Sequence, residues 1–269
     1  MTGADVAREG RWLAMAAPLC ALTRLHRNKR RRIGHEIERA SARRERSGAG
    51  RGAGLDSRRA MPRFRLGQYI STTFAVSDWR AFRLCGMDEV GRGAYAGPLV
   101  AGAVVLPPRF RHPLLRDSKL LSARQRETVA EVLRRDAVSW AVAEVGVDEI
   151  NTRGLGWANI DIFRRLVDAV MADGYCCDGK LRIVASHPVH CLVSGDRLVP
   201  SVSAASIIAK VHRDALMTRL HDEAPHYNWA RNKGYGAPEH RAAIREHGPH
   251  PAHRRVFLAN LMQTELALA

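Results

Sequence analysis

The fold of this protein is decided by the stretch Phe82-Arg83-Leu84-Cys85-Gly86-Met87-Asp88-Glu89-Val90-Gly91-Arg92-Gly93. A short apolar run that ends in turn residues is typical of a buried β-strand. A second apolar run, residues 99–106, follows the turn, so we predict two consecutive strands at the start of a sheet. Adjacent acids at a strand end are usually solvated turn residues. Here, two glycines flank Arg92, which lets the backbone approach a partner closely while the guanidinium reaches a phosphate.

The rest of the chain alternates between helix and strand patterns. Apolar residues at helical spacing, the first set opening with a serine cap, predict helices over residues 122–135, 156–171 and 203–221. Apolar or alternating runs predict further strands over residues 138–147, 181–185 and 191–193. Strands first, then alternation, then helices indicate an α/β sheet with a helical C-terminal portion that begins at about residue 215.

Positive charge is unevenly spread along the 269 residues. The formal net charge is +16, and residues 1–60 contribute 15 Lys/Arg against 6 Asp/Glu. A basic balance favours a polyanionic partner, nucleic acid before membrane. The remaining residues carry a moderate excess of +7. This fits an enzyme that contacts a few phosphates, because neutralising many would require a stronger bias.

Two segments define the predicted domain organisation. Residues 1–60 form a basic N-terminal extension that we expect to be disordered, since its Arg-, Ser-, Gly- and Ala-rich composition buries too little apolar surface. Two roles stay open for it, a nucleic-acid tethering arm or a non-essential extension with Met61 as the true start. Residues 78–262 form the predicted catalytic domain, including the helical C-terminal portion.

The cysteines and apolar segments favour a cytoplasmic location. The five cysteines show no pair of CxxC clusters of the kind that hold zinc, so a reducing compartment is the default. The apolar stretch at residues 12–22 is too short to span a bilayer and lacks a small-residue cleavage site. We therefore expect no membrane association and no secretory signal. Nothing in the sequence requires more than a monomer.

Four separated motifs agree in order and spacing with one known family. They are the stretch 88–93, Asp117-Ser118-Lys119, Gly195-Asp196 before an Ala-rich helix, and Asn232-Lys233-Gly234-Tyr235-Gly236. The set resembles ribonuclease HII from about Gly86 to Phe257. The resemblance implies a ribonuclease H-like fold, which is a five-stranded mixed sheet flanked by helices with a helical C-terminal extension.

The resemblance also implies an activity and a metal site. Members of the family hydrolyse the RNA strand of RNA-DNA hybrids, and cut at ribonucleotides embedded in duplex DNA, leaving 5′-phosphate and 3′-hydroxyl ends. Asp88, Glu89 and Asp196 match three of the four carboxylates that hold two Mg²⁺ or Mn²⁺ ions. Two hard cations about 4 Å apart activate a water on one side of the phosphodiester and stabilise the leaving oxygen on the other. Carboxylate oxygens suit such cations.

Substrate-binding residues carry over in the same way. Gly91, Arg92 and Gly93 match the loop that reads the 2′-hydroxyl, the group that separates RNA from DNA at one nucleotide. Tyr235 matches the tyrosine that packs on the following sugar. A further set is expected near the duplex backbone by analogy: Asp117, Ser118, Lys119, Lys210 and Arg213.

Simpler roles remain open for several of these residues. Ser118 can cap the following helix, and Lys210 can be a solvated helix charge. Asp214 is interpreted as the structural partner of a nearby arginine. Ser203 is interpreted as a close-packing residue, with an N-cap role open. The remaining histidines of interest, interpreted as solvent-facing or substrate-adjacent and not as metal ligands, are His247, His250 and His253.

One position departs from the family pattern, which places the remaining carboxylate as Asp-Gly at the end of an apolar strand. The corresponding run here is Leu181-Arg182-Ile183-Val184, and Ala185 follows it. On this alignment a metal-binding aspartate has become alanine. The alternative ligand is Asp178, which precedes Gly179, but it requires the apolar run to lie in a loop. We favour the vacancy at Ala185, which predicts slow cleavage.

Three classes of function therefore compete. The first is the endonuclease, and the second is a catalytically weakened homologue that binds hybrids or junctions because Ala185 replaces an acid. The third is a general basic nucleic-acid-binding protein that acts through residues 1–60. Cleavage rates separate the first two classes, and deletion of residues 1–60 tests the third.

Overall fold

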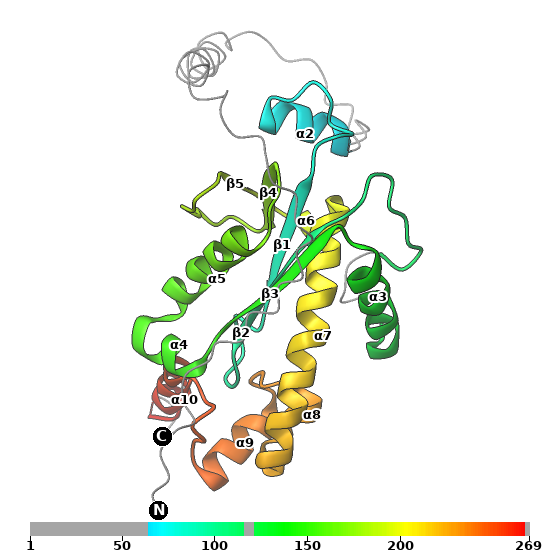
Figure 1. The fold of residues 1–269 in the computed structure, drawn as a ribbon. Coiled ribbons are helices and arrows are strands. Elements are labelled where there is room, and N and C mark those ends of the chain that lie inside the picture. Colours follow the sequence, from blue (N-terminus) through cyan, green and yellow to red (C-terminus); the bar gives the residue numbers. More distant parts are fainter. Residues whose placement is uncertain (1–63, 116–120, 267–269) are drawn as a thin grey trace, which may run out of the picture. The chain divides into compact units, whose positions relative to one another are not determined.

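The computed structural model describes residues 64–115 and 121–266 (Figure 1). The predicted extension at residues 1–60 lies outside this part, as do Asp117, Ser118 and Lys119. Within the described residues, no helix is long and apolar enough to cross a membrane.

A five-stranded sheet forms the centre of the fold. Its strands are β1 (Leu84–Val90), β2 (Leu99–Val105), β3 (Ser139–Val145), β4 (Gly174–Asp178) and β5 (Val189–Leu192). Their order in the sheet is β3-β2-β1-β4-β5. The first three strands are antiparallel, whereas β4 and β5 run parallel to β1. The predicted mixed sheet is therefore confirmed.

Helices cover both faces of this sheet (Figure 1). One face packs against α5 (Leu155–Ala169), which follows the short α4 (Val147–Arg153). The other face packs against α3 (Ala123–Asp136) and the long α7 (Pro200–Glu223). Side chains alternate along a strand, so Cys85 and Met87 of β1 enter the α5 side of the core while Gly86 faces α7.

The remaining helices precede the sheet, join β5 to α7 or follow α7. They are α2 (Leu66–Phe74), α6 (Gly195–Leu198), the 3₁₀ turn η2 (Pro225–Tyr227), α8 (Trp229–Asn232), α9 (Pro238–His247) and α10 (Arg255–Leu266). The helical C-terminal portion is as predicted, and so is the start of α3, where Ser122 and Gln125 form a capping box. Helix α2 was not predicted. The long helix begins one turn earlier than predicted, after Val199, so Ser203 is a buried packing residue and not its N-cap.

The predicted strand over residues 181–185 is wrong. These residues form no regular structure, and the strand of that region is β4, seven residues upstream. β4 pairs with the central strand β1, and this pairing buries Tyr175, Cys176 and Cys177. The apolar run lies in a loop instead, where Ile183 covers the core while Val184 is 65% exposed. The apolar composition of residues 181–185 thus indicates burial at the edge of the core and not pairing in a strand.

Helix α7 lies unusually close to β1 and β2. A Cβ atom at Gly86 would stand 2.1 Å from the carbonyl carbon of Ser201, and one at Gly102 would stand 2.5 Å from the carbonyl oxygen of Ala205. Backbone atoms of a packed helix cannot move aside without moving the whole element. Glycine at these two strand positions therefore sets the separation between the helix and the sheet.

We predict that Gly86→Ala destabilises the protein by about 1–3 kcal/mol, because the added methyl group forces α7 away from β1. Urea unfolding measures the change. Gly156→Ala in α5 is the matched control, since nothing lies within 4 Å of the place that its Cβ would take, and it should leave stability unchanged or slightly higher. Equal effects from both substitutions would contradict the close-packing argument.

Candidate active site

Acidic residues from three elements meet at one end of the sheet. Asp88 and Glu89 lie near the C-terminal end of β1, and Asp178 is the last residue of β4. The parallel register pairs Met87 with Cys177, so Asp88 and Asp178 follow at the same level on neighbouring strands. The N–H of Gly195 donates to Oδ1 of Asp178 at 2.7 Å, which holds the start of α6, and with it Asp196, beside the end of β4.

The environment of Asp88 is both buried and negative. Its side chain is 8% exposed, and it accepts hydrogen bonds from the Ser206 hydroxyl of α7 and from the N–H of Glu89. Burial raises the pKa of Asp88 to about 8, the hydrogen bond from Ser206 opposes this, and the charges of Glu89 and Asp178 add to it. Asp196 is also buried, at 6% exposure. The site therefore concentrates carboxylates where water screens them poorly.

The donor set is suited to a hard cation. It consists of carboxylate oxygens, the ligands that Mg²⁺ and Mn²⁺ prefer. In the described ranges, no three Asp, Glu, His or Cys side chains already surround a common point closely enough to hold an ion. The backbone thus places the acids together, and their side chains would have to turn toward a shared centre.

The glycine-rich loop, residues 91–98 between β1 and β2, lies beside Tyr235. More than 140 residues separate Arg92 of this loop from Tyr235 in sequence. Ala94 and Tyr235 form an antiparallel bridge, and the N–H groups of Tyr95 and Ala96 donate to the carbonyl of Gly234 at 2.7 and 3.1 Å. Arg92 is exposed, and Tyr235 is 38% exposed. The structure therefore brings together the two segments that the sequence singled out for sugar recognition.

Lys210 is partly buried and already paired. Its Nζ donates to Asp214 at 2.5 Å, and burial lowers its pKa despite this partner. Asp214 also lies 3.8 Å from Arg126, so the interpretation of Asp214 as a structural partner of an arginine is confirmed. A contact between Lys210 and phosphate stays a prediction.

Arg213 does not lie at the surface, and its expected place near the duplex backbone is wrong. Its side chain is fully buried, and it donates to the carbonyls of Pro98, Lys233 and Ala96 at 2.8–3.0 Å. The sequence around Arg213 in α7 gives no sign of this inward orientation. Only the close packing of the loop over α7 decides it.

The expected solvent-facing role is also wrong for His253. Its side chain is 2% exposed, its Nε2 lies 3.1 Å from Nε2 of His240, and the indole N–H of Trp229 donates to the same His240 nitrogen at 2.9 Å. Nδ1 of His240 lies 2.8 Å from the carbonyl oxygen of Tyr235. Burial lowers the pKa of both histidines. This aromatic cluster supports the backbone beneath Tyr235.

The sequence ranks one residue of the site region too low and gives no sign of another. It offers Asp178 only as the alternative ligand, because Asp178 precedes the apolar run, although the following Gly179 is a usable sign of a strand end. Arg254 drew no attention, yet it is fully buried and contacts the glycine-rich loop. No local pattern around Arg254 distinguishes it from the exposed Arg255 beside it.

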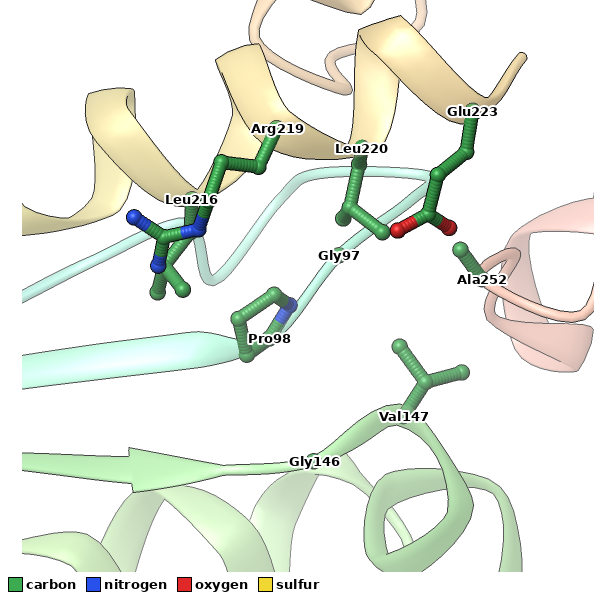
Figure 2. A pocket seen from close by; sticks show the side chains of 9 residues that line it. All are labelled: Gly97, Pro98, Gly146, Val147, Leu216, Arg219, Leu220, Glu223 and Ala252. Atoms are coloured by element: carbon green, nitrogen blue, oxygen red, sulfur yellow. The ribbon is translucent and has the colours of Figure 1, made fainter. Parts of the chain in front are cut away.

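A pocket of about 360 Å³ lies apart from Asp88, Glu89, Asp178 and Asp196 (Figure 2). Leu216, Arg219, Leu220 and Glu223 of α7 line one side, and Val147 lines the other. None of the acids at the end of β1, at the end of β4 or in α6 lines it. It reaches the glycine-rich loop only where that loop joins β2, so it is not the carboxylate site.

A mixed sheet in the order β3-β2-β1-β4-β5, with acids at the ends of its two central parallel strands, defines the ribonuclease H class of fold. Solved structures agree with this. Ribonuclease H2 from Pyrococcus horikoshii OT3 is similar with a TM-score of 0.57 and 26% identity, over 65% of this chain and 93% of that one.

Sequence comparison gives the particular family. Ribonuclease HII of Porphyromonas gingivalis is 42% identical over 182 residues, which cover 65% of this chain and 89% of that protein. Ribonuclease HII of Burkholderia lata is 44% identical over 176 residues, which cover 65% and 82%. The family model described as Ribonuclease HII matches residues 85–260, so this chain belongs to the ribonuclease HII family and is a ribonuclease H enzyme.

The buried charge at Asp88 predicts a pH-dependent stability in the presence of a chelator. The pKa of Asp88 is about 8 in the folded protein, above its ordinary value of 3.8. Between pH 3.8 and pH 8, the Asp88 carboxyl group therefore keeps its proton in the folded protein and loses it in the unfolded chain. This contribution to stability is therefore lost as the pH rises through that window. Asp88→Asn should stabilise the protein by about 1–3 kcal/mol at pH 8 and by much less at about pH 5.

Urea unfolding of both proteins at the two pH values measures this effect. The control is Asp222→Asn, which changes an exposed acid near the C-terminal end of α7 and should show no pH-dependent gain. A gain from Asp88→Asn that is equal at both pH values would show that burial of the charge is not the cause.

Proposed function

We propose that this protein hydrolyses the RNA strand of RNA-DNA hybrids, and cuts at ribonucleotides embedded in duplex DNA, with two Mg²⁺ or Mn²⁺ ions. The products are 5′-phosphate and 3′-hydroxyl ends. The observation that carries the proposal is the gathering of Asp88, Glu89, Asp178 and Asp196 at one end of two neighbouring parallel strands. We further propose a cytoplasmic monomer that acts in DNA replication and repair, where such duplexes arise.

Asp178 is the fourth carboxylate in this proposal. It ends a strand, it is followed by glycine, and it lies level with Asp88 on the adjacent strand. Its charge contributes to the raised pKa of Asp88. Ala185 instead lies in the loop that packs over the α5 side of the core. The vacancy rested on a strand over residues 181–185, and without that strand the weakened-homologue alternative loses its support.

In this proposal, four acids hold the cations and neighbouring groups orient the acids. Asp88, Glu89, Asp178 and Asp196 would hold the cations, which when bound supply water activation and stabilisation of the leaving oxygen. Ser206 holds the carboxylate of Asp88 from the helix side, and the N–H of Gly195 holds that of Asp178. Each acid retains other oxygen lone pairs for a ligand. Below about pH 8 a proton on Asp88 would compete with a cation.

Sugar recognition falls to the neighbouring loop. Residues 91–93 would contact the 2′-hydroxyl through backbone groups, because glycines let the backbone come close to a ribose. The partly exposed ring of Tyr235 would pack on the next sugar, where a deoxyribose leaves room for it. Lys210 and residues 118–119 would contact the duplex backbone.

The decisive test uses a DNA duplex with one embedded ribonucleotide, Mg²⁺ or Mn²⁺, and three proteins. The unmodified protein should cleave, and a chelator should abolish cleavage. Asp178→Asn should lower kcat by about 100-fold or more, because carboxylates that act as a unit fail together.

Ala185→Asp is the matched variant, since it restores the acid that the rejected alignment requires. It should leave the rate unchanged. A rate increase in Ala185→Asp, or full activity in Asp178→Asn, would contradict the assignment of the fourth carboxylate. Absence of cleavage by the unmodified protein would contradict the proposed function itself.

A further inference from the structure

Arg254 is a fully buried cation that contacts main-chain oxygen atoms. Its Nη1 donates to the carbonyls of Gly91 and Arg92 at 2.7 and 3.1 Å, and its Nε donates to the carbonyl of Gly97 at 2.9 Å. Nη2 is buried without a hydrogen-bond partner among the described residues. A single planar guanidinium thus grips both ends of the loop between β1 and β2.

Such a side chain is costly to bury. Desolvation lowers the pKa of Arg254 to about 9, and the positive charge of Arg213 adds to the effect. Carbonyl dipoles alone compensate a buried charge less well than a carboxylate would. An apolar residue of similar volume would fill the same space without this penalty. An apolar residue would, however, lose the hydrogen bonds to the loop.

The hydrogen bonds from Arg254 determine where the N–H groups of the loop point. A trans peptide directs its C=O and N–H in opposite directions, and the described residues contain no cis peptide. The carbonyls of Gly91 and Arg92 point inward to Arg254, so the N–H groups of Arg92 and Gly93, on the same two peptides, point away from it. Residues 92 and 93 are exposed, which leaves these donors facing outward.

A second buried arginine joins this loop to Tyr235. Arg213 donates to Ala96 and Pro98 of the loop and to Lys233 of the other segment, and its Cζ lies 5.5 Å from the centre of the Tyr235 ring. The backbone N–H of Arg254 also donates to the carbonyl of Tyr95 at 2.8 Å. The two guanidiniums therefore fix the loop from below and set its position against Tyr235.

We propose that Arg254 is a positioning residue that aims the N–H groups of Arg92 and Gly93 at the ribose 2′-hydroxyl and so sets the preference for ribonucleotides, without itself touching the substrate. The inference rests on the proposed function. It assigns the discrimination between ribose and deoxyribose to a residue in the C-terminal portion, far in sequence from the loop that makes the contact.

The test compares Arg254→Lys and Arg254→Gln with the unmodified protein. Lys keeps the charge but donates from one point, so it cannot reach both ends of the loop together. Gln removes the charge and keeps one donor group. The affinity for a duplex with one ribonucleotide, relative to an all-DNA duplex, is measured with a chelator present, and kcat and KM are measured with Mg²⁺. Thermal unfolding identifies which variants are folded.

In each folded variant, the affinity ratio should fall by about tenfold, the effect of losing one well-placed hydrogen bond. KM for the ribonucleotide duplex should rise, while affinity for the all-DNA duplex should stay the same. Arg255→Lys is the control, because this neighbouring side chain is exposed, and it should change none of these values. An unchanged ratio in a folded Arg254 variant would overturn the inference. A lack of discrimination or cleavage by the unmodified protein would instead point to failure of the proposed function.

A second, independent observation concerns Cys177 and Cys191. They are register partners on the parallel strands β4 and β5, and their Sγ atoms lie 2.7 Å apart. Neighbouring strands are about 4.8 Å apart, within the Cα separation that a disulfide spans. Cys177 is buried, whereas Cys191 is partly exposed and thus open to a small oxidant.

We infer that this pair is an oxidative modification site for hydroperoxides. The sulfur of Cys191 attacks a peroxide oxygen, breaking the O–O bond to give a sulfenic acid and water when the oxidant is hydrogen peroxide. The thiol of Cys177 then displaces a second water and forms the S–S bond. The two thiols lose two electrons in total and the peroxide gains them. The product closes the loop between β4 and β5, directly beside Asp178.

Treatment with hydrogen peroxide followed by mass spectrometry of the intact chain and its peptides tests this. We expect the loss of two hydrogen atoms, a peptide cross-link between Cys177 and Cys191, reversal by a dithiol, and a higher Tm, because a closed loop restricts the unfolded chain. Cys191→Ser should abolish the cross-link. Cys176→Ser changes the adjacent thiol, which accepts a hydrogen bond from the Tyr69 hydroxyl, and should preserve the cross-link. Free thiols at both positions after treatment, or stable over-oxidation of Cys191, would overturn the inference.

Discussion

The close approach of α7 to β1 and β2 is the constraint on which the rest of the structure depends. Gly86 and Gly102 have no side chain to hold the helix off, and backbone atoms of Ser201 and Ala205 occupy the space that a Cβ would need. Small residues on both sides allow this separation. As a result, one straight helix reaches from the end of β4, where α6 leads into it, to the loop beyond β1, where Arg213 is buried (Figure 1).

That helix connects the two halves of the site. Near its N-terminal end, Ser206 contacts Asp88 of the carboxylate cluster. Two turns later, Arg213 contacts the loop and the segment that carries Tyr235. A rigid element with both contacts fixes the distance between the acids and the segments that carry Arg92 and Tyr235. A change in the separation of helix and sheet would therefore alter both halves together.

Buried side chains of the C-terminal portion support the glycine-rich loop and the backbone of Tyr235. Arg254 holds the carbonyls of the glycine-rich loop, and His240 accepts the indole N–H of Trp229 beneath the backbone of Tyr235. These groups are polar, buried and satisfied mainly by main-chain atoms or by one another. Such networks specify one backbone geometry, because any other leaves polar groups without partners. The C-terminal portion thus fixes the backbone positions of the glycine-rich loop and of Tyr235.

The sequence by itself determined the local features of this protein. The strand that carries Asp88 and Glu89 near its end, the capped helix at Ser122 and the glycine-rich loop follow from patterns within a few residues. The α/β class follows from the order of such patterns along the chain. The tertiary structure alone decided which acids lie side by side and which arginines turn inward. Asp178 lies beside Asp88 because β4 pairs with β1 in one register, and Arg213 and Arg254 are buried because carbonyls more than 100 residues away face them. Pairing and burial between distant segments leave no periodic trace in the sequence, so only the folded chain reveals them.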